Sequence, residues 1–202
     1  MKEFLKRAFD LILSFTFLLI MLPFLLVLVI AIKMDSSGPV LYRGKRVGRE
    51  GIEFEILKFR TMVNRPSLVG PAITGGKDPR ITQVGRFLRN YKLDEIPQLL
   101  NVLRGEMSLV GPRPEDPKYV AHYTDEQRKA LSVLPGIASP AAVKFRHEET
   151  ILADVPPEKI DQVYLEEILP EKLALDLDYV NKNSLLLDIK ILTQAVLRSL
   201  GT

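Results

Sequence analysis

Residues 11–32 form an apolar run of 22 residues that contains no charged side chain. As one straight helix, this run would rise about 33 Å at 1.5 Å per residue, which is enough to cross the roughly 30 Å hydrocarbon core of a bilayer. A cleaved signal peptide has a shorter apolar core, usually about 7–15 residues, and no small-residue cleavage motif follows Ile32. The run therefore predicts an N-terminal segment that enters a membrane.

The flanks of the run do not give it a clear orientation. Basic residues precede it at Lys2, Lys6 and Arg7 and follow it from Lys33 onwards, so both ends have the character of cytoplasmic flanks. Pro23 lies near the middle, where it removes a backbone donor and displaces the carbonyl four positions before it. The composition leaves two structures open: a Pro-broken re-entrant helix that leaves on the face it entered, and a kinked transmembrane helix.

Lys6, Arg7 and Asp10 share one helical face just before the apolar run, because residues three or four apart are neighbours on a helix. They would lie at the level of the lipid headgroups. Two interpretations are open for them: an interfacial anchor with an internal ion pair, or a set of contacts to a ligand.

Composition excludes several kinds of site. The chain has no cysteine and only two histidines, His122 and His147, so disulfides, thiolate zinc sites, cysteine nucleophiles and multi-histidine metal sites are not expected. Any metal should be held by oxygen ligands. Although the net charge is only +3, basic residues predominate in residues 1–113 and acidic residues in residues 114–202. The basic part predicts an anionic partner, such as a phosphorylated ligand, nucleic acid or anionic lipid.

A polar break that contains Gly38 and Pro39 follows the apolar run. We therefore expect a membrane-embedded segment over residues 1–34 and a cytosolic globular domain over residues 35–202. Within that domain, Val40–Arg43 and Ile52–Phe59 have the pattern of two strands joined by a turn, which predicts a small hairpin.

The rest of the domain is expected to be helical. A basic amphipathic helix should begin at Thr82, a polar helix after Pro156 should end at Pro170, and a last helix should carry the apolar series from Leu185 to Val196. Asp176 and Asp178 could contact a site, but as solvated helix carboxylates they need no function, and the C-terminal part is interpreted as mainly structural. The fold class is α+β and mostly helical: a Pro-broken membrane helix plus a small domain with a short β-hairpin and amphipathic surface helices.

Three cations stand out beside apolar or rigid segments. Lys58 and Arg60 share a face at the end of the second predicted strand, because alternate residues of a strand point the same way. They form either an anion clamp at the domain's edge or a charged strand end that reaches water. Arg113 lies between Pro112 and Pro114, which limit its backbone freedom and suit it to bidentate phosphate recognition; a structural arginine in the turn is the alternative.

Asp94 and Glu95 are adjacent carboxylates at the start of a predicted helix, soon after Arg89 and Lys92. Asp94 alone is a credible N-cap, whose side chain would accept a hydrogen bond from the first helical turn. The two carboxylates and the nearby cations could also hold Mg²⁺ and a phosphate together. The residues themselves leave both interpretations open.

Several motifs occur in an order and spacing that resemble the bacterial sugar transferases of the small monotopic phosphoglycosyl transferase type. These motifs are Lys58–Met62, Asp78–Thr82, Leu93–Leu99 and Met107–Pro114. The likeness extends over nearly the whole chain, from Lys6–Asp10 and the Pro-broken helix to Leu175–Val180 and Leu187–Lys190. Each motif alone is weak evidence, whereas their ordered combination is specific.

The resemblance implies transfer of a sugar 1-phosphate from a nucleotide diphosphosugar, usually a UDP-sugar, to a polyprenol phosphate such as undecaprenyl phosphate, with release of UMP. It implies that Asp94 is the nucleophile, which forms a covalent phosphosugar intermediate and binds Mg²⁺, and that Glu95 is the second catalytic carboxylate. Such a reaction needs cations that neutralise phosphate charge. The expected ones are Lys58, Arg60, Arg89 and Arg113.

The resemblance also favours a re-entrant helix, broken at Pro23, at the cytoplasmic face of the bacterial inner membrane. The protein would then be monotopic, with the lipid bilayer as a partner. Members of the family often have serine before this proline, whereas Leu22 precedes it here. A homodimer is compatible with the sequence but not required by it.

The rival interpretation is a non-catalytic, membrane-tethered module whose basic half binds anionic lipid or nucleic acid. Such binding would weaken with added salt and would not need Asp94. Nucleic acid is not an expected partner, because the chain has no tryptophan and no basic stretch with interleaved aromatic residues.

Overall fold

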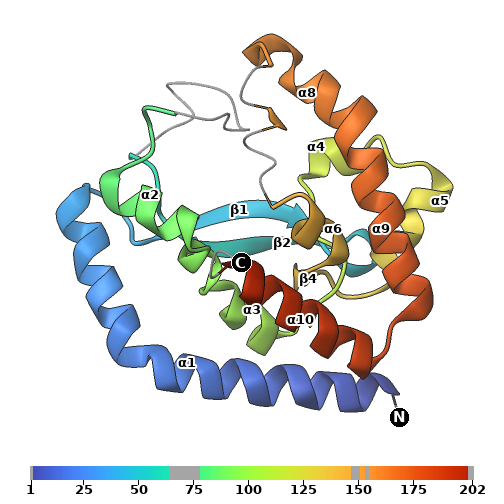
Figure 1. Cartoon of the computed structure of the whole chain (residues 1–202), viewed down its shortest axis with the longest axis horizontal. Coiled ribbons are helices and arrows are strands. Elements are labelled where there is room, and N and C mark those ends of the chain that lie inside the picture. Colours follow the sequence, from blue (N-terminus) through green and yellow to red (C-terminus); the bar gives the residue numbers. More distant parts are fainter. Residues whose placement is uncertain (1, 64–77, 147–150, 153–154, 200–202) are drawn as a thin grey trace.

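The computed structural model describes residues 2–63, 78–146, 151–152 and 155–199. These residues are mostly helical and include two small two-stranded sheets, which confirms the predicted α+β class. Figure 1 shows one long bent helix, α1, that runs along the outside of the other elements, with α10 beside its first half and the β1–β2 hairpin near the middle of the view.

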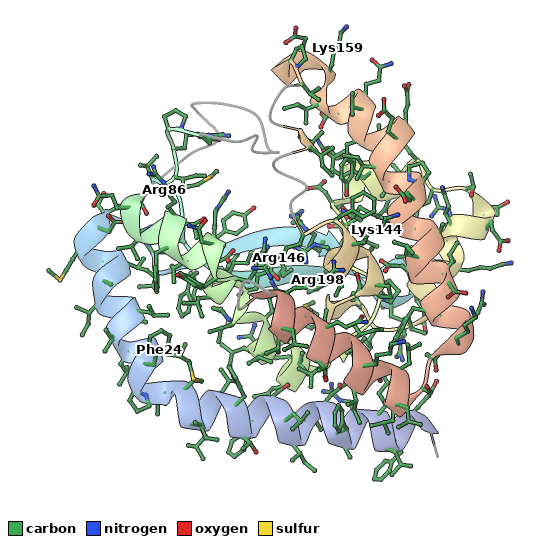
Figure 2. The ribbon with its side chains drawn as sticks, viewed as in Figure 1. Phe24, Arg86, Lys144, Arg146, Lys159 and Arg198 are labelled. Carbon is green, nitrogen blue, oxygen red and sulfur yellow. The ribbon has the colours of Figure 1, made fainter. Side chains whose placement is uncertain are left out.

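α1 spans Lys2–Asp35 and contains Pro23. The helix bends sharply where Figure 2 labels Phe24, so the predicted break takes the form of a bend inside one helix. The cause is the proline ring, which lacks an N–H and displaces the carbonyl of the preceding turn. By length and composition α1 could cross a membrane: its most apolar window has a mean hydropathy of 3.0, and only 11% of that window is buried.

The N-terminal end of α1 is attached to the globular part by buried polar contacts. Lys6 Nζ donates to the Asp188 carboxylate at 2.7 Å, although the two residues are 182 positions apart. Asp10, which is 2% exposed, accepts hydrogen bonds from Ser108 Oγ at 2.8 Å and from the Leu109 backbone N–H at 3.3 Å. The expectation of an internal ion pair at headgroup level is therefore wrong for Lys6, whose partner comes from the other end of the chain.

The predicted hairpin is confirmed and is longer than expected in its first strand. β1 (Leu41–Val47) pairs antiparallel with β2 (Glu53–Phe59), with Gly44 opposite Ile56. A short 3₁₀ turn, η1 (Arg49–Gly51), joins the two strands.

A second, parallel sheet was not predicted. β3 (Ser108–Val110) pairs with β4 (Gly136–Ala138). The two segments approach so closely that a Cβ on Gly136 would lie 2.0 Å from the backbone nitrogen of Gly111. Only glycine fits there, and the contact fixes the start of the loop that carries Arg113.

α2 (Gln83–Asn90) begins as predicted: Thr82 is its N-cap, and the Thr82 hydroxyl accepts a hydrogen bond from the Gly85 N–H. Asp35 at the end of α1 also accepts one from the Val84 N–H, at 3.1 Å. The C-terminal end of α1 is thus joined to the start of α2.

The remaining helices pack the hairpin and the second sheet. The chain continues from α2 through η3 (Leu93–Glu95) and α3 (Gln98–Arg104) to α4 (Pro117–Val120), α5 (Asp125–Arg128), η4 (Lys129–Ser132) and α6 (Pro140–Lys144). The C-terminal part consists of η5 (Pro157–Lys159), α8 (Ile160–Val163), a π-helical segment η6 (Tyr164–Ile168), α9 (Leu169–Lys182) and α10 (Leu185–Ser199).

The expected break at Pro170 is wrong. The chain stays helical from Ile160 through Lys182, and Pro170 lies in the first turn of α9, directly after the π-helical segment. A proline removes one backbone donor, and the wider i→i+5 bonding of a π turn accommodates that loss without ending the helix. The resulting long helix carries Tyr164, Leu173 and Tyr179 into the core.

Candidate active site

The acidic pair lies in η3, just before α3. Lys92, which precedes it, has φ 55° and ψ 23°, a left-handed conformation that is uncommon for a residue with a side chain. The N-cap position of α3 is Pro97, with no side-chain cap. The interpretation of Asp94 as an N-cap is therefore wrong, and its carboxylate is left for another use.

Asp94 is a buried carboxylate with an oxygen that is not satisfied by the protein. Its exposed fraction is 8%, and within the described part of the chain Oδ1 has no hydrogen-bond partner. Burial is the largest influence on its pKa and raises it above the ordinary 3.8, while the positive charges of Lys58, Lys92 and Arg89 act against this rise. A buried acceptor without a partner costs free energy, which a ligand can recover by supplying one.

Glu95 has the opposite environment. Its Oε1 accepts hydrogen bonds from Lys58 Nζ at 2.8 Å and from Arg113 Nη2 at 2.9 Å. Burial alone would raise the pKa of Glu95, but the charges of Arg113 and Lys58 outweigh it and hold the pKa well below its usual range. Glu95 is thus ionised, and it brings together two of the cations expected to bind phosphate.

Arg113 is positioned through its backbone by a residue that sequence reasoning assigned to solvent. Asp176 Oδ2 accepts a hydrogen bond from the Arg113 N–H at 3.0 Å, and Oδ1 accepts one from the Ala141 N–H at 3.4 Å. Asp176 is 3% exposed, and burial raises its pKa to about 6. The solvated interpretation is wrong for Asp176, whereas Asp178 is exposed and pairs with Lys182.

The spacing of α9 contained a signal for this burial. Leu173, Asp176 and Tyr179 recur every three residues, so Asp176 lies on the apolar face of the helix together with two buried side chains.

The other two predicted phosphate ligands have different surroundings. Arg89 Nε donates to Thr61 Oγ1 at 2.9 Å, and its charge lowers the pKa of Asp94, so it lies at the site. Arg60 is 7% exposed, and it donates hydrogen bonds to the carbonyl oxygens of Ile32, Ser36 and Pro39 and to the Ser36 hydroxyl, at the end of α1 and just beyond. Among the described residues Arg60 therefore joins α1 to β2 instead of contacting the acidic pair.

The site suits Mg²⁺ only if a substrate completes the coordination. The described residues contain no group of three or more His, Cys, Asp or Glu side chains that could hold a metal. Mg²⁺ is usually bound by one or two carboxylates together with substrate phosphates and water. Asp94 Oδ1, buried and without a partner among those residues, fits that requirement, whereas Glu95 Oε1 already has two cationic partners.

The variant Glu95→Gln is expected to flatten the acid dependence of stability. The folded pKa of Glu95 lies well below its usual 4.5, so the ionised side chain contributes stability that is present above about pH 4.5 and is lost as the pH falls through the folded pKa. Glutamine does not titrate. Unfolding midpoints measured between about pH 5 and pH 3 by circular dichroism in detergent should fall more steeply for the wild type than for the variant; equal slopes would contradict the ion pairs described here.

Comparison with known proteins identifies a protein family that matches this chain. A model of that family, described as "Bacterial sugar transferase", matches residues 1–202. The chain is 40% identical to the undecaprenyl-phosphate glucose phosphotransferase of Komagataeibacter xylinus over 96% of this chain and 36% of the relative. It is 37% identical to the UDP-glucose:undecaprenyl-phosphate glucose-1-phosphate transferase of Caulobacter vibrioides, over 95% of this chain and 68% of the relative.

A third relative has a different sugar in its name. The UDP-N-acetylgalactosamine-undecaprenyl-phosphate N-acetylgalactosaminephosphotransferase of Aeromonas hydrophila is 32% identical over 96% of this chain and 43% of the relative. The chain thus spans between about a third and two thirds of the length of these relatives. Because the family model matches residues 1–202 of this chain, the chain belongs to the bacterial sugar transferase family.

Proposed function

We propose that this protein transfers a sugar 1-phosphate from a UDP-sugar to a polyprenol phosphate, such as undecaprenyl phosphate, and releases UMP. The observation that carries the proposal is the pair of unlike carboxylates: Asp94 is buried with an oxygen that has no partner in the described structure, beside Glu95, which holds Lys58 and Arg113. The names of the relatives support the reaction class, with glucose in two of them and N-acetylgalactosamine in the third.

In the first step, an Asp94 carboxylate oxygen attacks the phosphorus that bears the sugar. A bond forms between that oxygen and phosphorus, and the bond between phosphorus and the bridging oxygen breaks, so that UMP leaves with the electron pair. Burial favours this role, because a carboxylate that has lost its hydration shell is a stronger base and nucleophile than one in water. In the second step, a phosphate oxygen of the polyprenol phosphate attacks the same phosphorus and frees Asp94.

Both steps bring anions together, so positive charge must surround the reacting phosphates. Lys58 and Arg113 are held by their shared contact with Glu95, the residue next to Asp94, and Arg89 adds a third positive charge near Asp94. When bound to Asp94, Mg²⁺ would neutralise phosphate charge and orient the diphosphate. Glu95 positions Lys58 and Arg113 by accepting a hydrogen bond from each. Asp176 does not contact the substrate in this proposal; it positions Arg113 by accepting a hydrogen bond from the Arg113 backbone N–H.

The membrane arrangement that we propose is monotopic, with residues 1–34 as a re-entrant segment and residues 35–202 as the catalytic domain at the cytoplasmic face. Lys6 and Asp10 contact Asp188 and Ser108 of the globular part, so the N-terminal end of α1 lies on the same side as that part. The bend at Pro23 lets the helix enter the bilayer and return. The acceptor phosphate lies at the membrane surface, where such an enzyme can reach it.

The proposed function predicts sugar-selective release of UMP. Protein purified in nanodiscs would be incubated with Mg²⁺ and a panel of UDP-sugars, with and without undecaprenyl phosphate, and the released UMP would be measured. We expect at least one donor to give sustained release that needs the lipid acceptor and stops when EDTA removes the metal. A folded protein that releases no UMP from any donor would overturn the proposal in favour of a non-catalytic binding module.

A further inference from the structure

A pocket of about 180 Å³ borders the acidic site. Lys58 and Arg113, the two cations that contact Glu95, form part of its lining. The opposite wall is formed by Glu115, Tyr119 and Lys172, and Arg46 also lines the pocket. The pocket is therefore lined by residues of the β1–β2 hairpin, the loop after β3, α4, η6 and α9, and it shares Lys58 and Arg113 with the acidic site.

The size of the pocket limits its occupant to one ring. Pockets that enclose a drug-sized ligand usually have volumes of roughly 300–1,000 Å³, so this one is too small for a whole nucleotide sugar. A monosaccharide ring or a nucleobase would fit. Because Lys58 and Arg113 lie at the diphosphate position, either ring would extend from the phosphates into this pocket.

The chemistry of the wall favours a ring rich in hydroxyl groups. Glu115 Oε1 accepts from Lys172 Nζ at 3.0 Å and from Tyr164 Oη at 2.7 Å, so the wall contains a carboxylate acceptor together with an ammonium and a hydroxyl donor. Hydroxyl groups both donate and accept hydrogen bonds, so vicinal hydroxyls can bridge such pairs. A nucleobase presents one neutral edge with a fixed pattern of donors and acceptors. It would therefore form fewer hydrogen bonds with a wall of paired charges.

The pocket lining combines a buried ion pair with a more exposed arginine. The side chains of Lys172 and Glu115 are 5% and 13% exposed, and such a buried ion pair adds little stability over apolar residues of similar volume. It does present fixed hydrogen-bonding atoms to a ligand. Arg46 is more exposed, at 26% of its side chain; its Nη1 donates to the Lys45 carbonyl oxygen at 2.6 Å and lies 3.5 Å from Asp116 Oδ2.

We propose that this pocket holds the sugar ring of the donor, and that Arg46, Glu115 and Lys172 select the sugar by hydrogen bonds to its hydroxyl groups. This inference rests on the proposed function and adds the sugar subsite to it. The UMP part of the donor then lies outside the pocket, on the other side of the diphosphate.

The test compares Arg46→Gln and Glu115→Gln with the control Arg43→Gln. Arg43 is also an arginine of β1 with a carboxylate partner, Glu55 at 3.3 Å, but its side chain is 61% exposed and it does not line the pocket. KM and kcat would be measured for each UDP-sugar that the wild type uses, and inhibition by UMP would be measured in parallel. Glutamine keeps much of the side-chain length in the arginine variants, so their fold should persist. Glu115→Gln keeps the shape of the side chain but removes the charged partner of the buried Lys172. Circular dichroism checks the fold of every variant, and Arg46→Gln carries the test if Glu115→Gln unfolds.

Both pocket variants should raise the KM for the preferred donor by about tenfold, as expected for the loss of a hydrogen bond to a charged group, and should change the preference between UDP-glucose and UDP-galactose. Inhibition by UMP should stay unchanged, and Arg43→Gln should behave as the wild type. Equal weakening of UMP and donor would overturn the inference and assign the pocket to the nucleotide. Kinetics of folded Arg46→Gln that match the wild type would overturn it as well, whereas a wild type without UMP release would be a failure of the proposed function itself.

Discussion

Asp94→Asn is expected to abolish UMP release while leaving the fold intact. Loss of the nucleophile removes the covalent route, and we expect turnover to fall by at least about a thousandfold. The side chain loses no hydrogen bond at Oδ1, because that atom has no partner in the described structure. Burial raises the pKa of Asp94, which means that ionising this side chain costs more free energy in the folded state than in the unfolded chain. A neutral asparagine removes this cost, so the unfolding midpoint should stay the same or rise.

Two quantities test this prediction: the rate of UMP release and the mass of the covalent intermediate. Wild-type protein mixed with donor in the absence of lipid acceptor should gain the mass of a phosphosugar on the peptide that contains Asp94, and the variant should not. Asp178→Asn is the matched control, because Asp178 is an exposed aspartate that pairs with Lys182 outside the site. A variant that lacks Asp94 but still turns over and still acquires the adduct would place the nucleophile on another residue.

Sequence patterns predicted the elements whose signal is local. The apolar run, the hairpin and the helix capped by Thr82 each depend on residues within a short window. The second sheet has no such signal, because β3 and β4 are three residues long and pair across an intervening stretch with three short helices. The continuation of the helix through Pro170 depends on a π-helical segment, which a residue pattern does not reveal.

In the candidate site, too, the sequence indicated the residue types, whereas contacts between distant segments could not be predicted. The sequence analysis predicted Lys58, Arg60, Arg89 and Arg113 as phosphate ligands near the acidic pair, and in the structure Lys58 and Arg113 both contact one oxygen of Glu95. The sequence could not show that Arg60 would contact the end of α1, because that contact depends on where β2 lies relative to a distant helix. Asp176 was missed for a related reason: a helical aspartate is usually solvated, and only the packing of α9 on the loop of Arg113 buries it.

The contacts at the N-terminal end of α1 lead to a second prediction, on membrane topology. Lys6 and Asp10 are bound to Asp188 and Ser108, so the start of α1 lies against the globular part. A straight transmembrane helix would carry this end across the roughly 30 Å hydrocarbon core and would break all of these contacts. It would also leave Asp10, which is 2% exposed, without its hydrogen-bond donors. In the proposed re-entrant arrangement, the bend at Pro23 would keep both ends on one face and avoid this cost.

Single cysteines can test this arrangement directly, because the chain contains no cysteine of its own. Glu3→Cys lies at the start of α1, Lys159→Cys in the globular part and Phe24→Cys at the bend, and Figure 2 labels the last two positions. A membrane-impermeant maleimide should modify positions 3 and 159 in inverted vesicles and neither of them in intact cells. Position 24 should stay unmodified in both until detergent dissolves the bilayer. Labelling of position 3 in intact cells, with position 159 protected, would instead require a helix that spans the membrane and a rearrangement of every contact between Lys6, Asp10 and the globular part.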